Sequence, residues 1–466
     1  MASLVRFRCL PRISTKTLLV GVDRDSSCKI LIGRLAEEIS ETDVWLDIEK
    51  EHVISIIGKR GSGKSYTLGC IAESLSAESD QIVTGQCNRA SLLFDTINIF
   101  WTMSHFPQDQ SHPEVVKQRS LLQQWKLESS HVDVDVWSPA GFEIPETKFP
   151  TFKITVSDLD ASDWCYLLGF DMIRDPGGQL ISEVVDKVRT TGWTWTERDE
   201  EGRAVRQKQM QPSNVYSLEE LVECAQHDRE ITSSSEGFAP QTRRAVANNL
   251  RALSRYELFA KEGTDLHVLL KPGSMTVLLL GIVPNDIRAA IVSVLIKKLL
   301  KVRAETSYYE KKRVIDRVEK DRLTEIVSTG IPKLSILVDE AQNLLPSTMR
   351  TLFNEIVVKL VREGRNYGIS VILTTQQPSA LDPRVMAQVD TLIVHKLTSQ
   401  QDIQYVVQNL KSSPGEEISL RGSQLTFEDL LRELPVGYAV ISSTEMKRAF
   451  VAAIRPRVTI HGGFEL

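Results

Sequence analysis

The sequence predicts an α/β fold whose main sheet is mostly parallel. The apolar segment 52–58 is typical of a strand, and it runs into a glycine-rich turn and then a helical pattern. From residue 274 onward, further strand-like segments alternate with helical patterns. Strands that alternate with helices favour a parallel sheet, because each parallel crossover needs a connection of helix length. A chain of 466 residues is long enough for two to four domains.

The composition is that of an ordinary globular protein, with 42% hydrophobic and 25% charged residues. The formal net charge is only −5, so contact with nucleic acid would need local basic patches. The apolar runs are far shorter than the ~20 residues that cross a bilayer, and the amino terminus lacks a continuous apolar signal core. We therefore expect a cytoplasmic protein with no membrane segment. The six cysteines form no Cys-x-x-Cys pair, which argues against a disulfide framework and a zinc site.

The apolar pattern divides the chain into five segments. They are a small β subdomain (1–50), the first part of a nucleotide-binding core (51–100), a helical insertion (101–265), the second part of the core (266–450) and a carboxyl-terminal segment (451–466). Expected strands lie at 17–22, 29–35, 274–281, 334–338, 369–375 and 391–395, and expected helices at 284–303 and 347–362. The charge-dense segment 305–325 is typical of a solvated helix or linker, with a DNA-contacting arm as the alternative.

The segment from Gly58 to Ser65 reads GKRGSGKS and matches the phosphate-binding pattern G-x-x-x-x-G-K-[ST]. Its glycines let successive backbone N–H groups point at a polyphosphate, helped by the positive end of the following helix. Lys64, expected to be an exposed loop lysine, would reach the β- and γ-phosphates, and the Ser65 hydroxyl would bind Mg²⁺. A purely structural turn is the alternative. The expected nucleotide-binding residues are Gly58, Arg60, Gly61, Ser62, Gly63, Lys64, Ser65 and Tyr66.

A second acidic element follows the strand-like segment 334–338. Asp339 would hold the Mg²⁺ through water, and Glu340 would polarise the attacking water. This pair favours hydrolysis over phosphoryl transfer to another substrate. It also disfavours a small-molecule kinase, for which no acceptor-pocket motif is present.

Two further groups of polar residues flank the strand-like segment 369–375. Gln376 follows it, at the sheet edge where open α/β sheets bind ligands, and could sense the γ-phosphate. A simple strand-end turn is the alternative. Arg362 and Arg365 precede the strand near a predicted helix end, where arginines also occur as caps or surface ion pairs.

With these elements in this order, the chain resembles the HerA family of ring-forming ATPases, within the HerA/FtsK group of RecA-like motors. The resemblance rests on the segments IIGKRGSGKSYTLG, PGSMTVLLLG, ILVDEAQNLLP, KLVREGRNYGISVILTTQQPSALDPRVMAQVDTLIVHKL and IRPRVTIHGG. It implies a RecA-like P-loop core that binds ATP and Mg²⁺, with Ser65 and Asp339 at the metal and Gln376 as the sensor. It also implies that Arg362 or Arg365 acts on the ATP of the neighbouring subunit.

The same resemblance implies a homo-hexameric ring with double-stranded DNA in its channel. It also implies an amino-terminal β-barrel and a segment 451–466 that braces the next subunit's nucleotide. Only about 50 residues precede the phosphate loop, so the barrel would be reduced or adapted to dock a partner. Relatives of this kind work with an effector, either a nuclease in DNA end processing or a nuclease or sirtuin-like NADase in phage defence.

Two hypotheses about function remain open. One is an ATP-hydrolysing motor on double-stranded DNA, and the other is a hexameric platform whose ATP site assembles the ring while a bound effector does the chemistry. The stretch 187–208 is the candidate DNA-contacting element, because it contains five basic residues besides Lys187 together with Trp193 and Trp195. Its acidic residues dilute that charge and favour a solvated hairpin.

Overall fold

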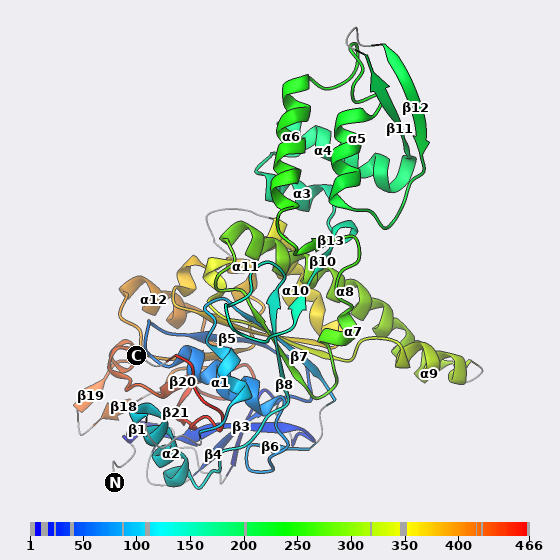
Figure 1. Ribbon diagram of the computed structural model, residues 1–466. Helices are drawn as coiled ribbons and strands as arrows, with labels where there is room; N and C mark the ends of the chain where they lie inside the picture. Colours follow the sequence, from blue (N-terminus) through cyan, green and yellow to red (C-terminus); the bar gives the residue numbers. More distant parts are fainter. Residues whose placement is uncertain are drawn as a thin grey trace. The chain divides into compact units, whose positions relative to one another are not determined.

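The computed structural model describes residues 5–10, 17–22, 25–37, 42–85, 88–107, 112–199, 203–316, 319–344, 352–415, 417–420 and 423–463. The chain forms two compact units (Figure 1). The first comprises residues 1–136, 266–282 and 299–466, and the second comprises 137–265 and 283–298. A large, mostly parallel sheet with helices confirms the predicted α/β class.

A long sheet organises the first unit. Its strand order is β2 (Thr17–Val20), β4 (Asp43–Asp47), β3 (Lys29–Leu35), β21 (Phe450–Ile454), β20 (Tyr438–Ser443), β17 (Thr391–Val394), β5 (Val53–Ile57), β16 (Ile369–Thr375), β15 (Leu334–Val338), β7 (Ala90–Asp95) and β14 (Met275–Leu279). The six strands from β17 to β14 run parallel to one another. Every residue of these six strands is buried, as expected for a parallel sheet covered on both faces.

The remaining elements of the first unit surround this sheet. They are the strands β1 (Phe7–Leu10), β18 (Glu417–Leu420), β19 (Ser423–Leu425) and β6 (Val83–Thr84), and the helices α1 (Lys64–Ser74), α2 (Pro113–Trp125), α7 (Leu266–Leu269), α9 (Lys320–Ser328), α10 (Leu352–Glu363), α11 (Pro383–Met386), α12 (Gln400–Gln408) and α13 (Phe427–Glu433). The strand β8 (Val134–Pro139) and the helix α8 (Asn285–Ile315) each run from one unit into the other.

The observed elements differ from the predicted ones in several places, and the strands β4, β7, β20 and β21 were not predicted. The helix expected at 284–303 continues to residue 315 as α8, so much of the charge-dense segment is helical. The strand β3 pairs with β21, so the amino-terminal strands extend the central sheet. Part of the helix expected at 347–362 lies outside the described residues, and α10 covers its second half.

The second unit is a helical group with a β-hairpin. Its elements are α3 (Ala161–Leu168), α4 (Pro176–Asp186), α5 (Leu218–His227), α6 (Pro240–Leu253), the hairpin strands β11 (Trp193–Arg198) and β12 (Ala204–Met210), and the short strands β9 (Thr151–Phe152), β10 (Ile154–Thr155) and β13 (Phe259–Ala260). Figure 1 shows the hairpin beside α5, and the four helices form one cluster.

Two expectations from composition have different outcomes. No helix in the described part of the chain has the length and apolar character that a bilayer crossing requires. Cys70, Cys165 and Cys224 are buried free thiols. Cys28, by contrast, is disulfide-bonded, which the spacing of the cysteines did not predict.

A buried ionic cluster joins the carboxyl-terminal segment to helix α1. Glu73 of α1 accepts hydrogen bonds from Arg455 Nη1 at 2.6 Å and Arg457 Nε at 3.4 Å. It also accepts bonds from the backbone N–H groups of Val458 and Thr459, at 3.0 and 3.1 Å. The side chains of Glu73, Arg455 and Arg457 are fully buried. This carboxylate therefore anchors the segment after β21 to the helix that begins at the phosphate loop.

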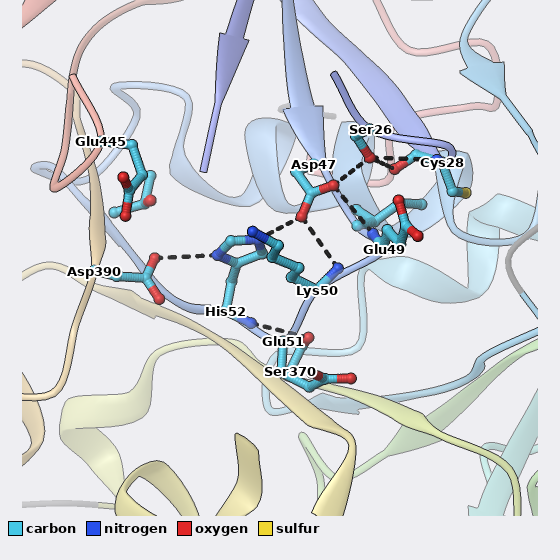
Figure 2. Close-up of polar contacts among 12 residues, drawn as sticks. Ser26, Cys28, Asp47, Glu49, Lys50, Glu51, His52, Ser370, Asp390 and Glu445 are labelled. Carbon is cyan, nitrogen blue, oxygen red and sulfur yellow. Dashed lines mark hydrogen bonds and ion pairs between the residues drawn. The ribbon is translucent and has the colours of Figure 1, made fainter. Parts of the chain in front are cut away.

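A second ionic cluster lies at the amino-terminal ends of the central strands (Figure 2). His52 Nε2 lies 2.9 Å from Asp47 Oδ2, and its Nδ1 lies 3.5 Å from Asp390 Oδ1. Asp390 also accepts a hydrogen bond from the Val53 N–H at 2.9 Å and pairs with Arg365. Burial alone would lower the pKa of His52, but its bonds to Asp390 and Asp47 outweigh burial and raise that pKa to about 9.

Replacing Glu73 with glutamine should lower the free energy of unfolding by about 3–5 kcal/mol, because two buried guanidinium groups would lose their counter-charge. Chemical denaturation measures this change. The matched control is Glu128→Gln, at an exposed glutamate of the same unit. Equal stability of the two variants would show that the cluster contributes no net stability.

The His52 cluster predicts a specific dependence of stability on pH. The pKa of His52 is higher in the folded state than in the unfolded state, so its contribution is fully present below pH ~6.5 and is lost as pH rises through about 9. Protonation of His52 should contribute up to about 3 kcal/mol. His52→Gln should flatten the fall in unfolding free energy between these pH values. His131→Gln, at an exposed histidine, should leave that fall unchanged, and an unchanged fall in His52→Gln would contradict the assignment.

Candidate active site

The phosphate-binding loop follows β5 at the carboxyl edge of the sheet. Gly61 and Gly63 have φ angles of 75° and 110°, a region that glycine adopts without strain. The Gly58 N–H donates to the Thr375 carbonyl of β16 at 3.2 Å, and the Lys59 N–H donates to the Lys396 carbonyl at 2.9 Å. The loop is thus held by the two strands that flank β5, and α1 begins directly after Gly63.

Lys64 lies between the loop and the acidic strand end. Its Nζ donates to the Lys59 carbonyl at 3.3 Å and lies 3.8 Å from Glu340 Oε1. The expectation of an exposed loop lysine was wrong, because only 4% of this residue is exposed. Burial lowers the pKa of Lys64, and the charge of Glu340 opposes that shift. The ammonium group is therefore already positioned beside the carboxylates that follow β15.

Asp339 directly follows β15, and one of its carboxylate oxygens has hydrogen-bond partners whereas the other has none in the described part of the chain. Its Oδ1 accepts from the Thr374 hydroxyl at 2.7 Å and from the Ser65 hydroxyl at 3.3 Å. Its Oδ2 is buried and has no hydrogen-bond partner among the described residues. Burial raises the pKa of Asp339 to about 6, and the nearby charge of Glu340 adds to that shift. A buried carboxylate with a free oxygen beside a hydroxyl fits a Mg²⁺ site, in which Ser65 and Asp339 would hold the ion.

Glu340 is oriented by two side-chain amides. Gln376 Nε2 donates to its Oε1 at 2.7 Å, and Gln342 Nε2 donates to its Oε2 at 2.5 Å. Its backbone N–H donates to the Thr374 hydroxyl at 2.8 Å, and its φ angle is 49°. A non-glycine residue in this left-handed region carries strain, which is often found at functional sites. The carboxylate is therefore fixed in direction, as a group that orients water requires.

Besides Thr374, three polar residues at this edge were missed by the sequence analysis. His395 is buried below the loop, where it bonds the Thr67 hydroxyl at 2.9 Å and the Tyr438 carbonyl at 2.8 Å. Burial lowers its pKa to about 4, so it is a neutral support. Asp95 at the end of β7 is fully buried, and burial raises its pKa to about 7. Gln342 is the third, and its place in ILVDEAQNLLP, two residues after Glu340, is the only signal that pointed to it.

The other expected loop residues occupy different surroundings. Ser62 is buried, and its hydroxyl donates to the Lys59 carbonyl at 2.7 Å. Arg60 is exposed at the tip of the loop. The Tyr66 hydroxyl accepts from the Arg457 N–H at 2.8 Å, and its ring meets His461 edge to face. Tyr66 thus connects the loop helix to the carboxyl-terminal segment of the same chain.

The two candidate arginines do not join this group. Arg362 lies in the last turn of α10 and Arg365 lies in the turn before β16, so both are at the amino edge of the sheet. The seven residues of β16 separate them from Gln376 by roughly 20 Å. Arg365 pairs with Asp390, whereas Arg362 is exposed and has no ion pair with another described residue. The carboxyl edge therefore gathers Lys64, Ser65, Asp339, Glu340 and Gln376 and leaves out both arginines.

A phosphate loop, a buried acidic strand end and a parallel α/β sheet together define a P-loop nucleoside triphosphatase. Within that class, the family model of the Helicase HerA central domain matches residues 30–299, more than half of the chain. The model of the Helicase HerA-like C-terminal domain matches residues 320–459. The chain belongs to the HerA helicase family.

Individual relatives agree with this assignment. The chain is 27% identical over 157 residues to the DNA double-strand break repair helicase HerA of Sulfurisphaera tokodaii, covering 34% of this chain and 28% of that protein. It is 25% identical over 203 residues to the protein of that name from Sulfolobus acidocaldarius, covering 42% and 36%. The matched regions thus span about a third of these relatives. Among solved structures, VirB4 of Thermoanaerobacter pseudethanolicus shares the fold, with a TM-score of 0.52, 13% identity and coverage of 93% of this chain and 97% of that one.

Glu340→Gln should slow ATP hydrolysis at least ~100-fold and change ATP affinity only a few-fold, because the amide keeps the shape of the side chain but cannot polarise water. Hydrolysis is measured by phosphate release and affinity by titration with a fluorescent ATP analogue. Glu433→Gln, at an exposed glutamate of α13, is the control. Loss of binding together with hydrolysis would instead assign Glu340 to the metal site or to the fold.

Proposed function

We propose that this protein is an ATP-hydrolysing motor that works as a homo-hexameric ring on double-stranded DNA. The observation that carries the proposal is the arrangement around Glu340, whose carboxylate lies 3.8 Å from Lys64 Nζ and is fixed by Gln376. Lys64 would neutralise the charge of the phosphates, and Ser65 and Asp339 would hold Mg²⁺. Glu340 would orient the attacking water, and Gln376 would link Glu340 to the γ-phosphate. A bound Mg²⁺ would neutralise charge on the phosphate oxygens.

The position of the arginines supports a ring. Charge that develops on the γ-phosphate during hydrolysis is commonly neutralised by an arginine, and the chain's two candidates lie at the edge opposite to its own phosphate loop. A neighbouring subunit whose amino edge meets this carboxyl edge would supply the missing cation. The exposed Arg362 is available for such a contact, and Arg365 would have to leave Asp390 to make it.

The substrate and the partner are proposed from the family. Two relatives are named as DNA double-strand break repair helicases, which supports duplex DNA as the substrate. We propose further that the ring acts with an effector protein, a nuclease or a sirtuin-like NADase, in DNA processing or phage defence.

Three measurements test this proposal. The mass of the purified protein with ATP should correspond to six chains, and duplex DNA should stimulate ATP turnover. Co-purification with the product of a neighbouring gene should identify the effector. A hexamer whose ATP turnover is unchanged by DNA, and whose partner remains active in a Glu340→Gln ring that binds ATP but barely hydrolyses it, would favour the assembly platform over the motor.

A mixing experiment tests whether the active site is shared between subunits. Lys64→Ala rings and Arg362→Ala rings should each hydrolyse ATP very slowly, since an arginine in this role contributes ~10³-fold or more. Rings reassembled from both variants should recover part of the activity, because some interfaces then pair an intact loop with an intact arginine. Arg365→Ala is tested in the same way.

The control for this experiment is Arg322→Ala, at an exposed arginine of α9, which should keep full turnover. Subunit exchange is verified by mass spectrometry of the mixed rings. Exchanged rings without recovered activity for either arginine would contradict a shared site.

A further inference from the structure

Helix α6 of the second unit has an unusual charge distribution. The segment 240–256 contains four arginines and no acidic residue, although the chain as a whole carries more acidic than basic residues. The apolar face of the helix is fully used within the unit, since Val246, Ala247 and Leu250 are completely buried. The positive charge therefore lies on the face that is left to solvent.

The exposed polar residues of this face form a single stripe. Arg244, Asn248, Arg251 and Arg255 are spaced by four, three and four residues, a repeat that keeps side chains on one side of a helix. Asn248 and the three arginines are exposed or only partly covered. Arg255 follows Ser254, which retains helical backbone angles and so continues the repeat. We call these four residues the α6 stripe.

The charges of the stripe are available for a ligand. Arg244 and Arg255 form no ion pair with any residue that the structure describes. Arg251 donates to the neutral Gln226 Oε1 at 2.6 Å, so its charge is not compensated. The adjacent Arg243 has its pKa lowered by burial and by the nearby charges of Arg198 and Arg244. Like charges thus accumulate at this surface instead of being paired.

The size and shape of the stripe match a nucleic-acid backbone. Arg244 and Arg251 are seven residues apart, about 10 Å along a helix, which corresponds to about three nucleotides of a duplex strand. The exposed small residues Ala245 and Ala252 flank the stripe and let a backbone approach closely. Arginine donates two parallel hydrogen bonds to a phosphate, and asparagine adds a neutral donor.

Two other kinds of partner fit this face less well. Protein interfaces depend on large apolar or aromatic anchors, and the exposed large hydrophobic residues of the described chain include none from α6. A membrane-bound helix inserts its apolar face into the lipid, but the apolar face of α6 is buried in its own unit.

We propose that the α6 stripe binds the phosphate backbone of double-stranded DNA. This inference rests on the proposed function and adds a DNA contact outside the ATPase core. The hairpin at 187–208 is the weaker candidate, because Trp193 is buried, Arg206 lies opposite Glu197, and Asp199 adds a further negative charge. The stripe has no such internal compensation.

The test compares full-length variants for binding to a labelled blunt DNA duplex over a range of salt concentrations. The stripe variant carries Arg244→Gln, Arg251→Gln and Arg255→Gln. The hairpin variant carries Arg206→Gln and Lys208→Gln. The matched control carries Lys148→Gln, Arg174→Gln and Lys261→Gln, at exposed basic positions of the same unit that lie outside the stretch 187–208. ATP turnover without DNA and the elution volume of each variant verify that it is folded.

The stripe variant should bind duplex DNA about 10- to 100-fold more weakly than the control, and the slope of log K against log salt should fall by about 2–3. Replacing the same arginines with lysine should restore most of that slope. If wild type binds DNA and the stripe variant binds equally well, or if only the hairpin variant is weakened, the inference is overturned and the proposed function stands. If wild type does not bind DNA, both are overturned.

Discussion

The parallel pairing of β5 on both sides is the constraint on which the site depends. The strand lies between β16 and β17, and β15 lies next to β16. Parallel neighbours all end at the same edge, so the phosphate loop, the Asp339–Glu340 pair and Gln376 must emerge together. The loop is then held by carbonyl groups of the residues that end or follow the flanking strands, Thr375 and Lys396. An antiparallel β16 would place Gln376 at the far edge and leave Glu340 without its orienting amide.

The charged residues at the two edges of the parallel sheet differ in how far their charges are compensated within the chain. At the carboxyl edge, Asp339 keeps one buried oxygen without a protein partner, and a bound cation can compensate such a charge. At the amino edge the charges are already compensated within the chain. His52 lies between two carboxylates, and the buried Arg89 donates hydrogen bonds to the Ile48 carbonyl and to Glu51. The first edge is thus arranged for a ligand, and the second stabilises the starts of the strands. Arg365 belongs to the second network in the isolated chain, so its transfer to a neighbour's phosphate would cost the ion pair with Asp390.

Local patterns in the sequence predicted much of the fold and the chemical identity of the site. The segment 58–65 specifies its conformation through glycines at positive φ, and the strands at 334–338 and 369–375 are continuous apolar runs. The structure of these three segments could therefore be predicted without knowledge of their neighbours in space. The burial of Lys64 could not be predicted in this way, because it depends on Glu340, some 276 residues away. His395 and Thr374 carry no local signal either, since a histidine or threonine at a strand end has many structural uses. The pairing of Arg365 with Asp390 depends on two turns that only the sheet brings together.

The second unit shows why charge counts along a sequence mislead. The stretch 187–208 was the predicted DNA-contacting element because basic and aromatic residues lie close together in it. In the structure, however, Arg206 lies opposite Glu197 in the β11–β12 pair, and Trp193 is buried. Helix α6 has fewer aromatic residues and was unremarkable in sequence, yet the packing of Val246, Ala247 and Leu250 turns every uncompensated arginine of its stripe toward solvent. A basic segment can attract a polyanion only through the positive charge that nearby acidic side chains do not compensate. In this unit, helical periodicity concentrates that uncompensated charge on one face of α6.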